Sequence, residues 1–321
     1  MKRVAALLAT ALAAIWMVAC GGGAEPGAPK RATLVLDFQP NAVHAGIYAA
    51  LKEGFYRDAG VELTVQQPSA STDAPKLLEA GRAQFAILDI HDLAIAREHG
   101  FDLVGVMPIV QRPLASVIAG DRGAVRRPRD LEGRTVGVTG LESDDAVLDS
   151  VVSADGGDPS QVHRVTIGFN AVAALAAGRV DAATAFWNAE GVTLQRQGLP
   201  TRTFRVDAYG APRYPELVMV TTAKTLGDDP ALVHDVVEAT ARGYSLATGD
   251  PERALDDLLG ADPSLDRADQ AAELRALESA RAFRDPGEFD WPVLKRWARW
   301  EARNGIVNKA PDVSATFARV K

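Results

Sequence analysis

The chain has 321 residues, of which 47% are hydrophobic and 24% are charged. This length usually divides into two domains, and the composition excludes a disordered, collagenous or disulfide-stapled protein. The formal net charge of −7 argues against a nucleic-acid partner, and the single cysteine excludes intrachain disulfides and thiolate metal sites.

The first residues have the pattern of an export signal. Two basic residues precede an apolar run over residues 4–18, which is too short to span a bilayer comfortably. The sequence MVAC, which ends at Cys20, resembles the bacterial lipobox, in which the cysteine becomes the lipid-bearing N-terminus. The alternative is an ordinary cleavage site beside a small buried cysteine. We predict a signal peptide over residues 1–20, lipidation of Cys20 and a flexible tether over residues 21–30.

The following residues alternate between strand-like and helix-like patterns. Short apolar or alternating runs predict strands over residues 33–36, 61–65 and 84–88. Helical spacing and start signals predict helices between them, over residues 45–57 and 75–81, and Gly60 and Gly81 are their expected stops. This order implies βαβ units and a largely parallel sheet.

A second block repeats the same order. It predicts strands over residues 134–138, 162–167 and 181–186, and helices over residues 144–152 and 171–177. One stretch also repeats locally, because LLEAGRAQ at residues 77–84 matches ALAAGRVD at residues 174–181. The match sets residues 89–91 in register with residues 186–188. Both triplets are then expected at the carboxyl ends of parallel strands, where open α/β sheets bind ligands.

Two extended runs, residues 104–119 and 216–222, lack helical spacing and are expected to cross between the two blocks. They divide the chain into a lobe 1, residues 31–115 plus 216–321, and a lobe 2, residues 116–215. A cleft between two hinged lobes is the natural ligand site. From Asp229 onward the pattern is helical, and the tryptophan stripe of the last predicted helix, residues 291–304, is expected to be its buried face.

The common motifs of enzymes do not occur in the sequence. There is no nucleophile elbow GxSxG, no phosphate-binding GxxxxGK[ST], and no GxGxxG after a predicted strand. The five histidines lack metal-ligand spacing, and a surface helix accounts for His91 and His99 better than a metal site does. We therefore predict a binding protein with no catalytic residue, metal ion or cofactor.

Polar and aromatic residues gather in a first segment, residues 36–48, which runs from a strand end through a turn into a helix. Asn41 has two possible roles there, as the cap of that helix or as a ligand contact. His44 falls in the first helical turn, near the positive helix end and the mouth of the cleft. A histidine buried for packing is its alternative role.

Residues 185–191 form the second segment. Trp187 offers a flat face, Asn188 offers a donor and an acceptor, and Glu190 offers a carboxylate that can accept two parallel N–H groups. A carboxylate in a first helical turn is also favoured by the helix dipole, which is the alternative role of Glu190. The turn that contains Tyr209 is expected to close one wall of the site.

These segments resemble one family, the thiamine-pyrimidine-precursor binding proteins of ABC importers, which are akin to sulfonate-binding proteins and to fungal pyrimidine synthases. The resemblance rests on LDFQPN at residues 36–41 with His44, LKEGFY at 51–56, GVEL at 60–63, WNAEG at 187–191 and DAYGAPRY at 207–214.

The resemblance implies an α/β, two-lobed periplasmic binding protein type II fold, in which each lobe is a largely parallel sheet flanked by helices and two crossover strands join the lobes. In such relatives an aminopyrimidine ring lies between aromatic side chains and an acidic residue receives its amidine-like edge. By matching position, Phe38 and either Trp187 or Tyr209 would be the stacking faces. Glu190 would be the carboxylate, in a charge-assisted pair that contributes about 1.5–3 kcal/mol. Further cleft candidates are Asn41, Asp89 and Ser116.

Two departures from the family pattern matter. Phe38 stands where Trp is common, so the width of the ligand is open. The fungal synthases have a cysteine-rich motif that a chain with one cysteine cannot supply, so we expect no synthase activity.

The sequence thus predicts a monomeric, lipid-anchored receptor on the extracytoplasmic face of the cell membrane, which delivers a thiamine pyrimidine precursor to an ABC permease. Riboflavin or another heteroaromatic ligand is the alternative for the same role. A sulfonate is disfavoured because Glu190 would repel it. An exported enzyme of pyrimidine metabolism, with His44 as its base, would need a second catalytic group that the sequence does not indicate.

Overall fold

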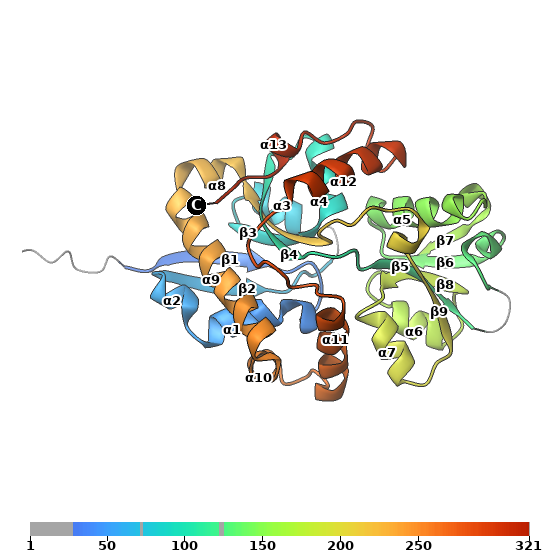
Figure 1. Ribbon diagram of the computed structural model, residues 1–321, viewed down its shortest axis with the longest axis horizontal. Coiled ribbons are helices and arrows are strands. Elements are labelled where there is room, and N and C mark those ends of the chain that lie inside the picture. The colour runs from blue at the N-terminus through green and yellow to red at the C-terminus, as the bar shows by residue number, and fades with distance from the viewer. Residues whose placement is uncertain (1–27, 71–72, 122–124, 321) are drawn as a thin grey trace, which may run out of the picture.

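The structure is a computed structural model that describes residues 28–70, 73–121 and 125–320 (Figure 1). The predicted signal peptide, the lipidation of Cys20 and most of the predicted tether lie outside these residues. Within the described ranges, no helix combines the length and the apolar character that crossing a bilayer requires. The chain forms two five-stranded sheets, which lie side by side along the long axis of the molecule.

The first sheet has the strand order β2-β1-β3-β10-β4 and combines early and late parts of the chain. β1 pairs in parallel with β2 and β3, whereas β10 runs antiparallel to both β3 and β4. Its strands are β1 (Lys30–Val35), β2 (Val61–Gln66), β3 (Phe85–Asp89), β4 (Leu103–Val110) and β10 (Leu217–Thr222).

Helices cover both faces of this sheet. One face carries η1 (Ala42–His44), α1 (Ala45–Lys52), α2 (Phe55–Asp58), α9 (Pro230–Gly249), α10 (Pro251–Ala261) and α11 (Arg267–Ser279). The other face carries α3 (Asp73–Glu79), α4 (Ile90–Glu98), α12 (Trp291–Arg303) and α13 (Val313–Thr316), and α8 (Ala223–Asp228) follows β10 at the edge.

The second sheet has the equivalent order β7-β6-β8-β5-β9, in which β5 is the antiparallel strand. Its strands are β5 (Ala115–Gly120), β6 (Thr135–Val138), β7 (His163–Thr166), β8 (Ala182–Phe186) and β9 (Thr201–Arg205). α5 (Glu142–Ala154) covers one face, and α6 (Ala171–Ala176) with α7 (Glu190–Arg196) covers the other. Short 3-10 turns complete it: η2 (Pro128–Leu131), η3 (Pro159–Gln161) and η4 (Val206–Tyr209).

This architecture confirms the predicted fold class. β3 and β8 hold the same position in their sheets, as the repeated stretch predicted, and each lies between a parallel and an antiparallel neighbour. The sheets are mixed because each contains one strand, β10 or β5, that enters from the other sheet.

Local sequence sets the ends of the helices. Gly60 and Gly81, the predicted stops, have left-handed backbone with φ of 75° and 66°. The predicted helix over residues 45–57 is interrupted, because Gly54 has a φ of 79° and separates α1 from α2. Asp side chains cap the helices α9 to α12; that of Asp229, for example, accepts a hydrogen bond from the Leu232 N–H at 3.0 Å.

The tryptophan stripe of α12 is buried as predicted, with Trp297 and Trp300 packed above α4. The same helix overturns the prediction for His91, which is fully buried rather than on a surface. Its ring nitrogens contact Glu301, on α12, and the Tyr214 hydroxyl. The surface interpretation was wrong because α12, which covers His91, lies about two hundred residues later in the chain.

Two segments connect the sheets. The first crossing segment, residues 111–114, joins β4 to β5, and the second, residues 206–216, joins β9 to β10. The fully buried side chain of Glu216, in the second segment, accepts hydrogen bonds from the backbone N–H groups of Leu114 and Ala115. The two connections are therefore tied to each other at the point where the lobes meet.

The contact between α1 and α9 provides a test of the packing. A Cβ on Gly243 would lie 2.0 Å from the carbonyl oxygen of Gly46, so Gly243→Ala must push the helices apart. We expect it to lower the free energy of unfolding by about 1–3 kcal/mol or more, measured by urea denaturation. Gly227→Ala, where nothing lies within 4 Å, is the matched control and should not lose stability. Equal unfolding free energies for wild type and Gly243→Ala would contradict this packing.

Candidate functional site

A cavity lies between the lobes, where the carboxyl ends of the parallel strands of both sheets face each other. Lobe 1 contributes the residues that follow β1 and β3, and lobe 2 contributes those that follow β6, β7 and β8. The cavity occupies the position at which open α/β sheets bind their ligands.

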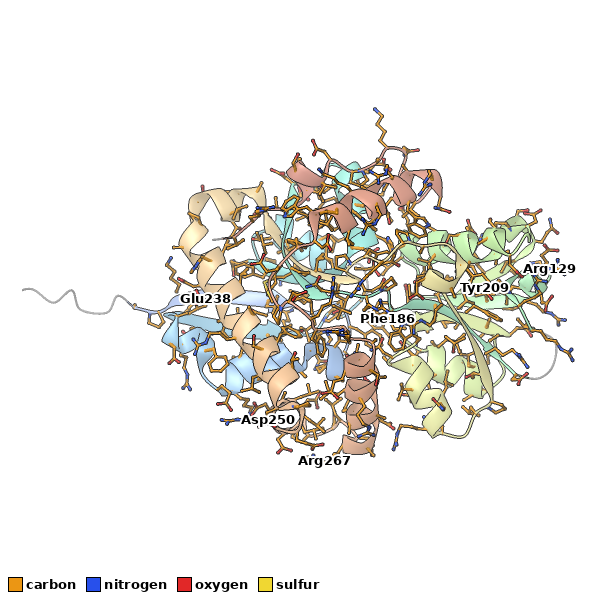
Figure 2. All side chains as sticks on the ribbon, in the orientation of Figure 1. Arg129, Phe186, Tyr209, Glu238, Asp250 and Arg267 are labelled. Carbon is orange, nitrogen blue, oxygen red and sulfur yellow. The ribbon has the colours of Figure 1, made fainter. Side chains whose placement is uncertain are left out.

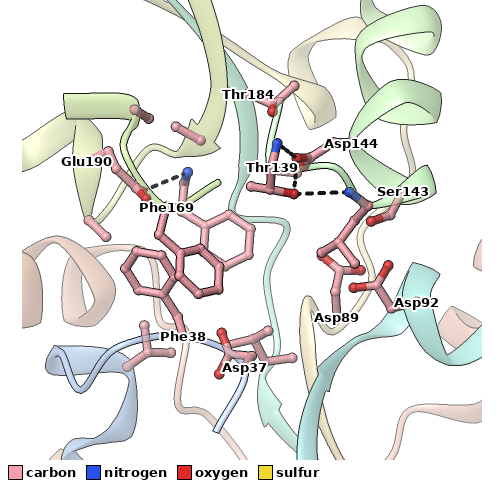
Figure 3. A pocket seen from close by; sticks show the side chains of 18 of the residues that line it. Asp37, Phe38, Asp89, Asp92, Thr139, Ser143, Asp144, Phe169, Thr184 and Glu190 are labelled. Atoms are coloured by element: carbon pink, nitrogen blue, oxygen red, sulfur yellow. Dashed lines mark hydrogen bonds between the residues drawn. The ribbon is translucent and has the colours of Figure 1, made fainter. Parts of the chain in front are cut away.

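Aromatic rings from both lobes form the middle of the cavity. Phe38, from lobe 1, meets Phe169, from lobe 2, with ring centroids 4.6 Å apart and ring planes at 80°. Phe186, the last residue of β8, also lines the cavity. Figure 3 shows Phe38 and Phe169 at the centre of the site. These rings are apolar surfaces against which a flat heteroaromatic molecule can stack.

Five carboxylic acids line the same cavity: Asp37, Asp89, Asp92, Asp144 and Glu190. Among the described residues, no lysine, arginine or histidine belongs to the lining. The site therefore favours a ligand that carries positive charge or several N–H donors, and it disfavours an anion.

Glu190 lies at one end of the cavity, as the first residue of α7. Its Oε2 accepts a hydrogen bond from the Phe186 N–H at 3.1 Å. Burial raises the pKa of Glu190 to about 7, with a further contribution from the carboxylates of Asp144 and Asp37. The carboxyl therefore changes its protonation state near neutral pH. A ligand that donates N–H groups to it stabilises its charged form.

Asp89, Asp92 and Asp144 lie across the aromatic rings from Glu190 (Figure 3). The Oδ2 atom of Asp144 accepts hydrogen bonds from the Thr139 N–H at 2.7 Å and the Thr139 hydroxyl at 2.5 Å. Burial raises the pKa of Asp144, and it raises that of Asp92 to about 7. This end of the cavity thus holds a second group of carboxyl oxygens that can accept hydrogen bonds from a ligand.

Asp89 connects the cavity to the crossing segments. It caps α4, where its Oδ1 accepts a hydrogen bond from the His91 N–H at 2.7 Å. Burial raises the pKa of Asp89 well above its usual value, and the nearby carboxylate of Glu216 adds to this. Asp89, His91 and Glu216 each offer a ligand atom within 4.8 Å of the others. Both ring nitrogens of His91 are already engaged, by Glu301 and Tyr214, so the imidazole is not free to bind a metal ion.

Several residues named from the sequence line the cavity: Phe38, Asn41, Asp89, Ser116 and Glu190. Asn41 has the predicted capping role, because its Oδ1 caps η1 by accepting from the Val43 N–H at 2.9 Å, and its ligand contact stays a prediction. His44 lies behind the lining, fully buried, with its Nε2 2.9 Å from Asp37 Oδ1. It holds the carboxylate of Asp37 in place rather than facing the cavity.

Three other residues named from the sequence lie outside the lining. The indole N–H of Trp187 donates to the Pro113 carbonyl at 2.9 Å, and the guanidinium of Arg205 lies 4.2 Å from the Trp187 ring centroid. Asn188 is fully buried, and its side-chain nitrogen and oxygen have no hydrogen-bond partner among the described residues.

Tyr209 packs edge-on against Phe204, and Figure 2 shows it farther out over lobe 2 than Phe186. The stacking surface expected from Trp187 or Tyr209 is instead formed by Phe169 and Phe186. Trp187 turns away because it follows the end of β8, where its indole anchors the first crossing segment.

Sequence reasoning missed Asp92, Asp144 and Phe169. Asp144 and Phe169 follow the ends of β6 and β7, so applying the strand-end rule to every parallel strand of lobe 2 would have found both.

Known proteins provide an independent comparison. Residues 41–254 match the family described as NMT1/THI5 like. Over 256 residues the chain is 29% identical to the formylaminopyrimidine-binding protein of Halalkalibacterium halodurans. This alignment covers 79% of this chain and 78% of that protein. Over 239 residues it is 26% identical to the 4-amino-5-hydroxymethyl-2-methylpyrimidine phosphate synthase of Legionella pneumophila, which spans 74% and 75%.

Solved structures share the fold. The alkanesulfonate-binding protein SsuA from Xanthomonas axonopodis pv. citri, bound to MOPS, has a TM-score of 0.71 at 18% identity, over 91% of this chain and 99% of that one. At this level of identity the likeness establishes the two-lobed binding-protein fold. It does not establish the ligand.

Glu190→Gln tests the protonation of the site. Between its ordinary pKa of 4.5 and about 7, Glu190 keeps a proton in the folded protein that the unfolded chain has lost. Native protein then binds more protons than unfolded protein, so the contribution of Glu190 to stability falls as the pH rises through this interval. Gln stays neutral, so we expect the unfolding free energy of Glu190→Gln, relative to wild type, to rise from about pH 5 to about pH 8 in ligand-free protein.

The control for this measurement is Glu79→Gln, which changes an exposed carboxylate. Its difference from wild type should be the same at both pH values. A Glu190→Gln difference that is constant, or that grows towards acid pH, would contradict a raised pKa at Glu190.

Proposed function

The chain belongs to the NMT1/THI5-like family, and we propose that it is the solute-binding receptor of an ABC importer for a thiamine pyrimidine precursor. Family membership over residues 41–254 and the two-lobed fold both support a receptor that binds a small molecule. In this role the chain captures an aminopyrimidine between its lobes and delivers it to a permease in the membrane. The predicted lipid anchor at Cys20 would hold it on the extracytoplasmic face.

One observation carries the choice of ligand. The cavity combines three phenylalanine rings with five carboxylic acids, and no basic side chain of the described residues lines it. A sulfonate carries a permanent negative charge, which these carboxylates would repel. An aminopyrimidine is flat, so it can stack on the rings, and it presents N–H donors to the acids.

Glu190 fits the edge of such a ring. An aminopyrimidine places an exocyclic N–H donor beside a ring nitrogen. The Glu190 carboxyl, with its pKa of about 7, can accept a bond from the amino group while it shares a proton with the ring nitrogen. A charge-assisted pair of this kind contributes about 1.5–3 kcal/mol.

The acids across the rings from Glu190 suit the substituent of the precursor. Asp89, Asp92 and Asp144 offer acceptors there, and the hydroxyl of Ser143 lies beside them. The relative from Halalkalibacterium halodurans is named for a formylaminopyrimidine, whose amide-type N–H matches such acceptors. The Phe38 and Phe169 rings touch edge to face, so they have to separate to admit a ligand ring. We propose that the ligand ring stacks on these two side chains with its substituent towards Asp144.

Lobe closure would provide the coupling to transport. Contacts that join the lobes lie around the cavity: the Phe38–Phe169 ring contact, and an ion pair between Arg196, on α7, and Asp269, on α11. A ligand that touches both walls favours the closed arrangement by its differential affinity for it. We propose that this chain binds without catalysis, because its single cysteine cannot form the cysteine-rich motif of the fungal synthases.

A ligand panel tests the proposal. Isothermal titration calorimetry should compare a formylaminopyrimidine and a hydroxymethylpyrimidine with riboflavin and an alkanesulfonate. We expect saturable binding of a pyrimidine without turnover and no binding of the sulfonate. Riboflavin binding without pyrimidine binding would show that the proposed ligand is wrong and would leave the receptor role unchanged. Conversion of a pyrimidine into a new product would overturn that role.

Variants of the site provide the second test. Glu190→Gln removes the charge-assisted pair and should weaken pyrimidine binding by about tenfold or more. Phe169→Ala should weaken it as well, because it removes one stacking face. The control is Glu79→Gln, since this residue does not line the cavity. Full affinity in Glu190→Gln would exclude the proposed orientation of the ring.

A further inference from the structure

Four arginines come together beside the crossing segments, and none of the four lines the cavity. Arg112 belongs to the first crossing segment and Arg213 to the second. Arg281 and Arg284 belong to the loop between α11 and α12, residues 280–290. The convergence is notable in a chain whose formal net charge is −7.

Gln111 holds these three segments together. Its backbone N–H donates to the Ala282 carbonyl at 2.7 Å. Its side-chain amide donates to the backbone carbonyls of Arg284 at 2.7 Å, Asp285 at 3.0 Å and Glu288 at 3.2 Å. The Nε atom of Arg213 approaches the Gln111 carbonyl at 3.4 Å. The backbone that carries the arginines is thus fixed by hydrogen bonds centred on one buried residue.

The guanidinium groups have too few partners for their charge. Within the described part of the chain, the only carboxylate within 4.0 Å of any of them is that of Asp285, 3.9 Å from Arg284. The buried Nε atoms of Arg112 and Arg284 have no hydrogen-bond partner there. Burial, and then the neighbouring charges of Arg284, Arg112 and Arg281, lower the pKa of Arg213, while Asp290 acts in the opposite direction.

The loop itself is strained. Arg281 and Asp285 have φ of 53° and 45°, and they are the only non-glycine residues with left-handed backbone in the described ranges. At Arg281 this backbone closes the end of α11, where the Ala282 N–H donates to the Leu277 carbonyl at 2.9 Å. At Asp285 the hydrogen bond from the Gln111 side chain to the Asp285 carbonyl helps to hold it.

We propose that Arg112, Arg213, Arg281 and Arg284 form a binding site for a multivalent oxyanion of the phosphate type. Guanidinium groups match such anions, because their planar donors pair with two oxygens at once. An anion here would supply the missing acceptors and neutralise the mutual repulsion of the arginines. It would also join both crossing segments to lobe 1. The site is separate from the cavity, whose acidic lining selects the opposite charge.

The test compares Arg213→Gln/Arg284→Gln with a control of equal charge change, Arg31→Gln/Arg275→Gln, in which both arginines are exposed. Pyrophosphate is the probe, at low ionic strength, with thermal unfolding and calorimetric titration as readouts. We expect saturable binding to wild type and to the control, and a loss of affinity of about tenfold or more in Arg213→Gln/Arg284→Gln.

The sign of the thermal shift provides the sharper criterion. Without pyrophosphate, Arg213→Gln/Arg284→Gln should unfold at a higher temperature than wild type, because it relieves repulsion. With saturating pyrophosphate, wild type should be the more stable. Equal pyrophosphate shifts in both double variants, or no saturable binding to wild type, would overturn the proposal.

Two further measurements identify the source of the anion and check the fold. Binding to phosphatidylglycerol vesicles, but not to phosphatidylcholine vesicles, would assign the same arginines to a lipid phosphate. Binding of free pyrophosphate alone would assign them to a soluble anion. The retention of pyrimidine binding by Arg213→Gln/Arg284→Gln would show that its cavity is intact.

Discussion

The burial of carboxylic acids around a cavity whose described lining contains no basic side chain is the constraint on which the rest of the site depends. Water hydrates a carboxylate strongly, so moving one into a cleft costs free energy unless a partner replaces the water. Here the described lining gives Asp144 the N–H and hydroxyl of Thr139, and it gives Glu190 the backbone N–H of Phe186. The remaining acceptor capacity has to be satisfied by water or by a ligand with donors, so an acidic lining favours ligands that carry N–H groups.

The topology explains how two small lobes assemble such a lining. Each sheet receives one antiparallel strand from the other side of the hinge, and this arrangement turns the carboxyl ends of both sets of parallel strands towards each other. Phe38 and Phe169 follow the strands β1 and β7, which belong to different sheets, yet their rings are in contact. A stacking site divided between two bodies binds fully only when the bodies meet. In the receptor role that we propose, ligand binding and closure of the lobes would therefore occur together.

Patterns with a short range in the sequence predicted the fold well. The repeat at residues 77–84 and 174–181 correctly predicted that β3 and β8 hold equivalent positions in their two sheets. The glycines at positions 60 and 81 correctly predicted where helices end. Contacts of long range were not predictable in the same way. His91 was misplaced because its cover, α12, comes far later in the chain, and Trp187 was expected in the cavity because its residue type suits stacking. The direction of a side chain just beyond a strand end depends on tertiary contacts, which residue type does not encode.

The hinge and the cavity share a short path of contacts. Asp89 lines the cavity, and its carboxylate interacts with that of Glu216, whose burial raises its pKa to about 7. Glu216 in turn accepts hydrogen bonds from Leu114 and Ala115, at one end of the first crossing segment, while Gln111 holds the other end to the loop at residues 280–290. Both ends of this four-residue segment are therefore fixed by hydrogen bonds. A rotation of the lobes would have to change the few backbone dihedral angles that remain within the segment. A positively charged or N–H-rich ligand beside Asp89 stabilises the ionised form of that acid. Such a ligand would therefore act next to the hydrogen bonds by which Glu216 joins the two crossing segments.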